Sequence, residues 1–165
     1  MSVSVRVIGD AAIARAMADA GEKIQRNTLK RSVRRAANIF KDEAKRLAPH
    51  VPGGADMRDA IGVSVRSPGG LPTAVVRLRG PHAFLGLFHE FGVAPHWIGE
   101  EGQELTIGEN VVEGPVLHPG HRAQPFFRPA FDTQQDAAFK AFEDYLRGEV
   151  EKQGYMVAEP QGDDE

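Results

Sequence analysis

The side chains best suited to metal or acid–base chemistry are histidines in the middle of the sequence. His89 precedes Glu90, as at the start of the zinc-protease motif HExxH, but residue 93 is Val instead of the second His. Three histidines from residues 89–121 could converge on a metal ion, yet histidines in polar loops more often hydrogen-bond locally. We therefore expect no metal and no cofactor, and a His-based metal hydrolase is a minor alternative. The loops of this region contain His96, Trp97, His118 and His121.

Other catalytic motifs are missing from the sequence. There is no cysteine, which excludes thiol catalysis, thiolate zinc sites and iron–sulfur clusters. The sequence contains neither a GxSxG nucleophile elbow nor the GxxxxGK[ST] and GxGxxG nucleotide-binding motifs. Glu100 and Glu101 are adjacent acids in a predicted loop, not an acid/base pair. The residues thus predict a protein that is not an enzyme.

Basic side chains gather in the first third of the chain. Residues 1–48 carry 11 Lys and Arg against 5 Asp and Glu, whereas residues 132–165 carry 3 against 10. One set, spaced four, seven and four residues apart, shares a helical face that could follow a phosphate backbone, dock on an acidic partner or remain solvated. This basic face comprises Lys30, Arg34, Lys41 and Lys45. A nucleic-acid-binding module is therefore an alternative function, although no aromatic side chains alternate with these bases to stack nucleotides.

The apolar spacing predicts two helices with short strands between them. Apolar positions three and four residues apart indicate a long helix over residues 27–48, and a second helix starting at Pro125 and continuing to about Val150. Alternating side chains predict a strand near the N-terminus, a hairpin and two further short strands. These strands cover residues 2–8, 61–65, 76–78, 105–107 and 111–116, and residues 83–91 fit either a helical turn or a strand.

A chain of 165 residues with 41% hydrophobic and 26% charged residues is typical of one globular domain. We predict an α+β domain over residues 1–154, with the long N-terminal helix and the C-terminal helix packed on one face of a small antiparallel sheet of about four strands. Residues 155–165 are expected to form an acidic, flexible tail. Apolar runs are too short for a membrane helix and the N-terminus does not resemble a signal peptide, so we expect no membrane partner.

Three short strings form the most specific pattern. The first, Ala44 to Pro49 with Gly53 and Gly54 after it, ends a helix; the others are His89 to Gly92 and Gln124 to Phe131. The second string places an acid, Glu90, beside an aromatic and a Gly, and the third starts a helix that carries Arg128. We therefore predict that Glu90 and Arg128 approach each other or share a backbone network joining the sheet to the last helix. Since helix neighbours point about 100° apart, we expect one of two Phe side chains to be exposed for a partner. The predicted fold lock or interface comprises Glu90, Phe91, Gly92, Phe126, Phe127 and Arg128.

Together the strings resemble the siphophage tail-completion and head–tail joining proteins, such as lambda minor tail protein Z and the gene-product-ten tail components of HK-type phages. That family has a basic helix ending in aP-x-x-TG-x-L, then vEFGT and qPFLRPA. The matching residues are Ala48-Pro49, Gly54, Met57, Glu90-Phe91-Gly92 and the segment from Gln124 to Ala130. The chain departs at Gly53, at Val93 and in a longer connection over residues 93–120, where we expect specificity to lie in the four His and Trp side chains named above.

The resemblance implies a non-enzymatic virion component of the neck and tail, assembled in the cytoplasm of the bacterial host. It would complete the tail and help join it to the head, in a phage, a prophage or a gene-transfer particle. The implied partners are a tail terminator, the tail tube or tape-measure protein, and head-completion or connector proteins. The resemblance also implies a homo-oligomeric ring and allows contact with DNA in the neck.

Overall fold

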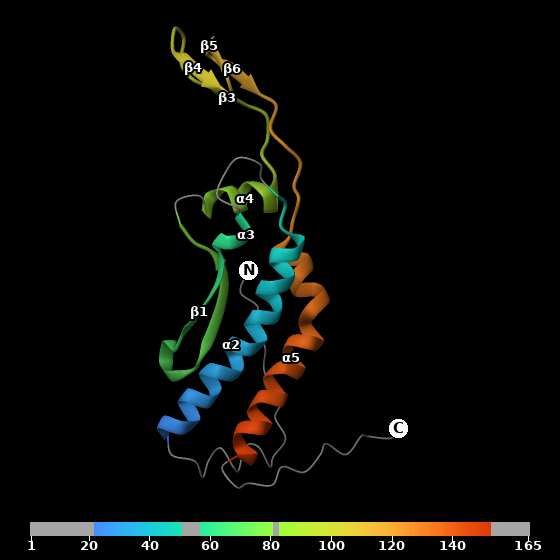
Figure 1. Ribbon diagram of the computed structural model, residues 1–165. Helices are drawn as coiled ribbons and strands as arrows, with labels where there is room; N and C mark the ends of the chain where they lie inside the picture. Colours follow the sequence, from blue (N-terminus) through green and yellow to red (C-terminus); the bar gives the residue numbers. More distant parts are fainter. Residues whose placement is uncertain (1–21, 51–56, 81–82, 153–165) are drawn as a thin grey trace.

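The computed structural model describes residues 22–50, 57–80 and 83–152 of the 165-residue chain (Figure 1). The predicted strand over residues 2–8, the turn at Gly53 and Gly54, and the acidic tail lie outside the described residues. The helices are α2 (Glu22–Leu47), α3 (Met57–Ala60), the 3-10 turn η1 (Pro68–Gly70), α4 (Ala83–Phe91) and α5 (Phe127–Glu151). The strands are β1 (Ile61–Arg66), β2 (Thr73–Leu78), β3 (His96–Ile98), β4 (Glu104–Ile107), β5 (Asn110–Glu113) and β6 (Val116–His118).

The two long helices, α2 and α5, lie side by side and antiparallel (Figure 1). Their apolar faces meet along the seam, where the Phe40 and Phe131 rings stack with centroids 5.0 Å apart. Further along the seam, the packed side chains are Leu29, Val33, Ala36, Phe142 and Leu146. These α2 positions are the ones whose spacing predicted the helix, which starts earlier than expected, at Glu22.

The α+β class is confirmed, but the strands of the described residues form three separate two-stranded antiparallel sheets instead of one sheet of about four strands. The pairs are β1 with β2, β3 with β6, and β4 with β5. Among the described strands, those of the β1–β2 hairpin pack on α2, and α5 packs on the α2 helix instead of on the same sheet face. The sheet stays small because the later strands leave the body in the long connection that follows α4 (Figure 1).

The main core lies at the end of the body where α2 finishes and α5 begins. It contains Ala44, Ala48, Met57, Ile61, Phe126 and Ala130. Residues 83–91, whose sequence fits either a helical turn or a strand, form the helix α4, which covers this core. Gly86 is buried there. A Cβ at this position would collide with Leu78 from β2, so the close packing of α4 on this strand requires a glycine.

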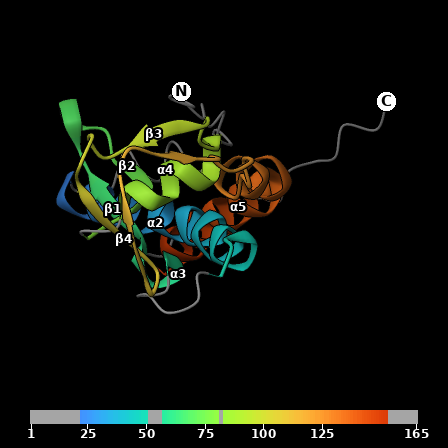
Figure 2. The same cartoon turned by 90° about the horizontal axis from the view of Figure 1, so that it is seen from above.

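Residues 93–121 form an arm that extends from the α4 end of the body (Figure 1), and the view from above looks along this arm onto the body (Figure 2). The arm closes at its base, where Val93 and His121 exchange two backbone hydrogen bonds of 2.9 Å. None of the buried hydrophobic side chains of the described residues comes from the arm. The arm therefore makes no contribution to the hydrophobic core of the body.

Replacement of Phe126 by Ala tests the position of the core. The Phe126 side chain is fully buried, so its removal leaves a cavity and should lower the free energy of unfolding by about 3–5 kcal/mol. Phe139→Ala is the matched control, because Phe139 on α5 is exposed and its loss should cost less than about 1 kcal/mol. Urea denaturation measures both values, and equal losses would contradict the assignment of the core.

Candidate functional site

The carboxylate of Glu90, in the last turn of α4, caps the N-terminus of α5. Its Oε2 accepts hydrogen bonds from the backbone N–H groups of Phe126 (2.9 Å) and Phe127 (3.0 Å), and its Oε1 accepts one from Arg128 (3.1 Å). The first N–H groups of a helix have no partner within the helix, and the N-terminus favours negative charge. Phe126, at the cap position, has no side-chain acceptor. Glu90 therefore supplies the cap from another helix.

This arrangement confirms that Glu90 and Arg128 share a backbone network, but the network joins the helix α4 to α5, whereas it was expected to join the sheet to the last helix. The guanidinium of Arg128 is not part of it. Arg128 Nε instead lies 3.8 Å from Asp132 Oδ2, one turn further along α5. The sequence pattern identified the correct acid and the correct helix start, but the contact uses the main chain of α5.

The expectation that either Phe126 or Phe127 is exposed is wrong. Phe126 is fully buried, and Phe127 is partly buried against the same core, with the two rings 4.5 Å apart. The 100° rule for helix neighbours fails here because Phe126 precedes the first helical residue, with φ −132° and ψ −29°. Both rings can therefore point to the core.

Gly92 connects α4 to the arm. Its φ of +75° lies in the left-handed region, and its N–H donates to the Phe88 carbonyl (2.8 Å). A Cβ at this position would lie 2.8 Å from the Ala123 nitrogen and 3.0 Å from the His121 oxygen. Gly at this position lets α4 end directly against the returning chain, which places the base of the arm beside Glu90.

The outward face of α4 is apolar. Phe91, one of the predicted interface residues, is 75% exposed. Three other exposed side chains lie on the same face at helical spacing, namely Phe84, Leu87 and Phe88. Their spacing was visible in the sequence, but it could be recognised only once residues 83–91 were known to be helical.

The histidines of the middle region form two pairs along the arm. His96 and His118 face each other in the β3–β6 register with ring centroids 5.0 Å apart, and His121 lies 5.3 Å from His89 of α4. Among the residues that the structure describes, no group of three or more His, Asp or Glu side chains could hold a metal ion. Trp97 pairs with Leu117 in the β3–β6 register and is 66% exposed. The four residues expected to carry specificity thus all lie on the arm.

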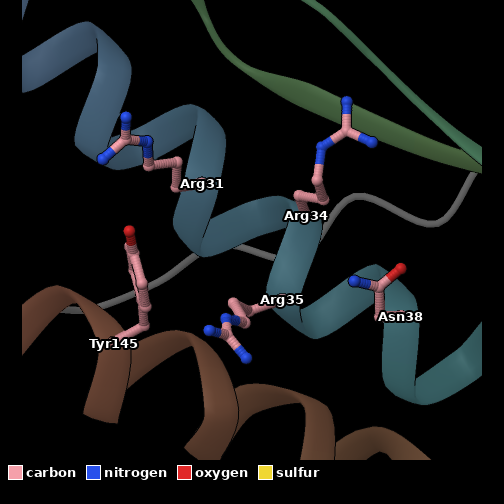
Figure 3. Close-up of a pocket in the computed structure, with 5 residues that line it drawn as sticks. All are labelled: Arg31, Arg34, Arg35, Asn38 and Tyr145. Atoms are coloured by element: carbon pink, nitrogen blue, oxygen red, sulfur yellow. The ribbon is translucent and has the colours of Figure 1, made fainter.

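The predicted basic face of α2 differs in detail from the charge distribution in the structure. Lys30, Lys41 and Lys45 are only partly exposed, and Lys41 Nζ lies 3.0 Å from the Asp42 carboxylate. Arg34 is exposed, and beside it the structure contains an open hollow of about 200 Å³ between α2 and α5 (Figure 3). The hollow is lined by Arg31, Arg34, Arg35, Asn38 and Tyr145.

Three arginines line this arginine hollow, and the Arg34 side chain points away from Tyr145 (Figure 3). Arg35 lies over the Tyr145 ring, 5.5 Å from its centroid, and Figure 3 shows Tyr145 rising from α5 toward Arg31. Sequence reasoning missed Arg31, Arg35 and Tyr145 at this site. The four-residue spacing of Arg31 and Arg35 was available as a signal, but the contribution of α5 required the pairing of the helices.

Replacement of Glu90 tests the cap. Glu90→Ala leaves three helix N–H groups without their acceptor and should lower the free energy of unfolding by about 2 kcal/mol, whereas Glu90→Gln keeps an oxygen acceptor and should cost about 1 kcal/mol. The control is Glu101→Gln on the exposed arm, expected to change stability by less than about 0.5 kcal/mol. Urea denaturation is the measurement. A Glu90→Ala protein as stable as this control would disprove the cap.

The pH dependence of stability tests the environment of His89. Burial, and then the nearby His121, lower the pKa of His89, whose Nδ1 is buried with no hydrogen-bond partner. The unfolded chain, where His has its ordinary pKa of about 6.5, then binds the proton more readily than the folded chain. The free energy of unfolding should therefore fall as the pH drops through about 6.5. Denaturation at pH 7.5 and 5.5 should show a smaller fall in His89→Gln than in the wild type, and an equal fall in the two proteins would contradict this environment of His89.

Comparison with known proteins identifies the family. Residues 8–92 match the model of the family described as "Bacteriophage HK97-gp10, putative tail-component". The match ends at Gly92, so it includes the helix α2, the β1–β2 hairpin and Glu90, and it stops where the arm begins. No curated protein and no solved structure matches the chain. Among the described residues, no helix is long and apolar enough to cross a membrane.

The family model spans more than half of the chain and includes the capping residue Glu90. The two shared strings within this range are the end of the basic helix and the Glu-Phe-Gly sequence at the end of α4. The chain therefore belongs to the HK97-gp10 family of phage tail components.

Proposed function

We propose that this tail component completes the tail and helps join it to the head. The observation that carries the proposal is the arm, residues 93–121. It projects from the body, supplies no hydrophobic side chain to the core, and exposes Trp97 and Leu117 as a cross-strand pair. Such a pair on a projecting hairpin fits a contact with a partner, because aromatic side chains are enriched in the central contacts of interfaces.

The partners proposed for this role are the tail terminator, the tail tube or tape-measure protein, and the head-completion or connector proteins. A tail is built on repeated contacts around one axis, so a homo-oligomeric ring is the assembly that fits this position. The role is structural and not enzymatic. It places the protein in the neck or tail of the virion, after assembly in the host cytoplasm.

Deletion of the gene from its phage or prophage tests the proposal. Without the protein, filled heads and separate tails should accumulate, because neither partner has its joining surface. Electron microscopy of induced lysates counts joined particles, and a plasmid copy of the wild-type gene should restore them. Normal numbers of joined, infectious particles in the deletion would refute the role in joining.

A second complementation separates the arm from the body. Residues 94–120 are replaced by a short Gly-Ser linker, which is feasible because Val93 and His121 already bridge the base of the arm. The body should keep its stability, but the variant should fail to restore joined particles. Full restoration by the armless protein would show that the arm does not carry the function.

A further inference from the structure

The arginine hollow carries positive charge that the described part of the molecule does not neutralise. Arg31, Arg34 and Arg35 come from consecutive turns of α2, and no ion pair joins them to an acidic side chain of the described residues. Elsewhere on α2, basic side chains have local partners, as in the pair of Arg46 with Glu43 at 2.6 Å. Three arginines beside one open hollow suit a ligand with several carboxylate or phosphate oxygens.

The arm has the opposite charge. Between Val93 and His121 the sequence contains five Glu and no Asp, Lys or Arg, so the arm carries a formal charge of −5 with neutral histidines. All five carboxylates are on exposed residues, and none pairs with a basic side chain of the described residues. The five are Glu100, Glu101, Glu104, Glu109 and Glu113.

The arm and the hollow of one molecule lie far apart. The arm leaves the body beside Phe126 at the start of α5, whereas Tyr145 of the hollow is 19 residues further along the same helix (145 − 126). At 1.5 Å per residue, this separation is about 28 Å. The arm also points away from the part of the body that contains the hollow (Figure 1). A contact between the two surfaces must therefore join different molecules.

We propose that the arginine hollow of one copy binds the Glu-rich arm of a second copy. The proposal rests on the proposed function, whose ring it supplies with an interface. Such a contact is heterologous, since it uses two different surfaces of the same chain. Repetition of one heterologous contact closes into a ring when the rotation between copies permits, and otherwise continues as a filament. Complementary charge would also speed the encounter between copies and fix their orientation.

DNA is the competing anionic ligand, and the charge distribution disfavours it. The chain has a net charge of −3, so its overall field does not attract DNA. The predicted stripe for a phosphate backbone is also interrupted at Lys41, which lies against Asp42. What is left is a compact cluster of arginines, which fits a local group of carboxylates better than a continuous strand.

Charge reversal on the full-length protein tests this interface. One variant carries Arg31→Glu, Arg34→Glu and Arg35→Glu, and a second carries Glu100→Lys, Glu101→Lys and Glu104→Lys. A matched control reverses three bases outside the hollow, with Arg66→Glu, Arg77→Glu and Lys140→Glu, which are also exposed. Circular dichroism and urea denaturation verify folding, and light scattering coupled to size exclusion measures the mass of each protein.

The wild type and the control should self-associate at low salt, and each should weaken when salt is raised to 0.5 M. Either reversed variant alone should lose self-association, with the dissociation constant raised roughly 100-fold or more. The two variants mixed, or both reversals combined in one chain, should associate again because each contact regains opposite charges. A monomeric wild type at low salt, equal loss in the control, or no rescue by the combined reversal would overturn the proposal.

Two further outcomes identify other occupants. If a 20-base-pair DNA duplex binds the monomeric wild type and the hollow variant loses that binding, the hollow is a nucleic-acid site and the arm contact is refuted. If the hollow variant fails to self-associate yet restores joined particles in the gene deletion, the interface is unnecessary while the joining function stands. If the wild type self-associates as expected but the deletion still gives joined particles, the interface holds and the function fails.

Discussion

The structure depends on the cap that Glu90 places over the first turn of α5. α4 is not continuous with either long helix, and α5 begins at a residue that has no capping side chain of its own. One carboxylate with three backbone hydrogen bonds therefore connects two elements that are 36 to 38 residues apart in sequence. Because the Gly92 turn follows two residues later, the same contact fixes where the arm starts. A loss at Glu90 would thus disturb both the helix seam and the direction of the arm.

The sequence predicted the parts of the fold that follow from periodicity. The apolar spacing of residues 29–47 predicts the seam face of α2, and the alternation at Ile61, Val63 and Val65 predicts β1. The separation of the strands into three small sheets could not be predicted, because short alternating segments contain no information about which strands pair. The strand β3 was missed for a related reason, since three residues are too few to show a period.

The site was predictable where it is local and unpredictable where it joins distant segments. Glu90 and the start of α5 were both selected from the sequence, but a bond to main-chain N–H groups leaves no side-chain signature, so the sequence could not decide between the Arg128 side chain and a backbone network. The arginine hollow needs Tyr145 from a helix more than a hundred residues later. Only the antiparallel packing of α2 and α5 brings these side chains together.

The closed base of the arm has a consequence for how such proteins diversify. Val93 and His121 exchange both backbone hydrogen bonds, so the excursion between them enters and leaves the body at a single point. Insertions or deletions in this hairpin would leave the helices and their packing unchanged, because no core side chain originates there. Relatives can thus acquire new recognition hairpins by recombination while they inherit the same helical scaffold. A change in what the arm contacts is then a change in one exchangeable segment.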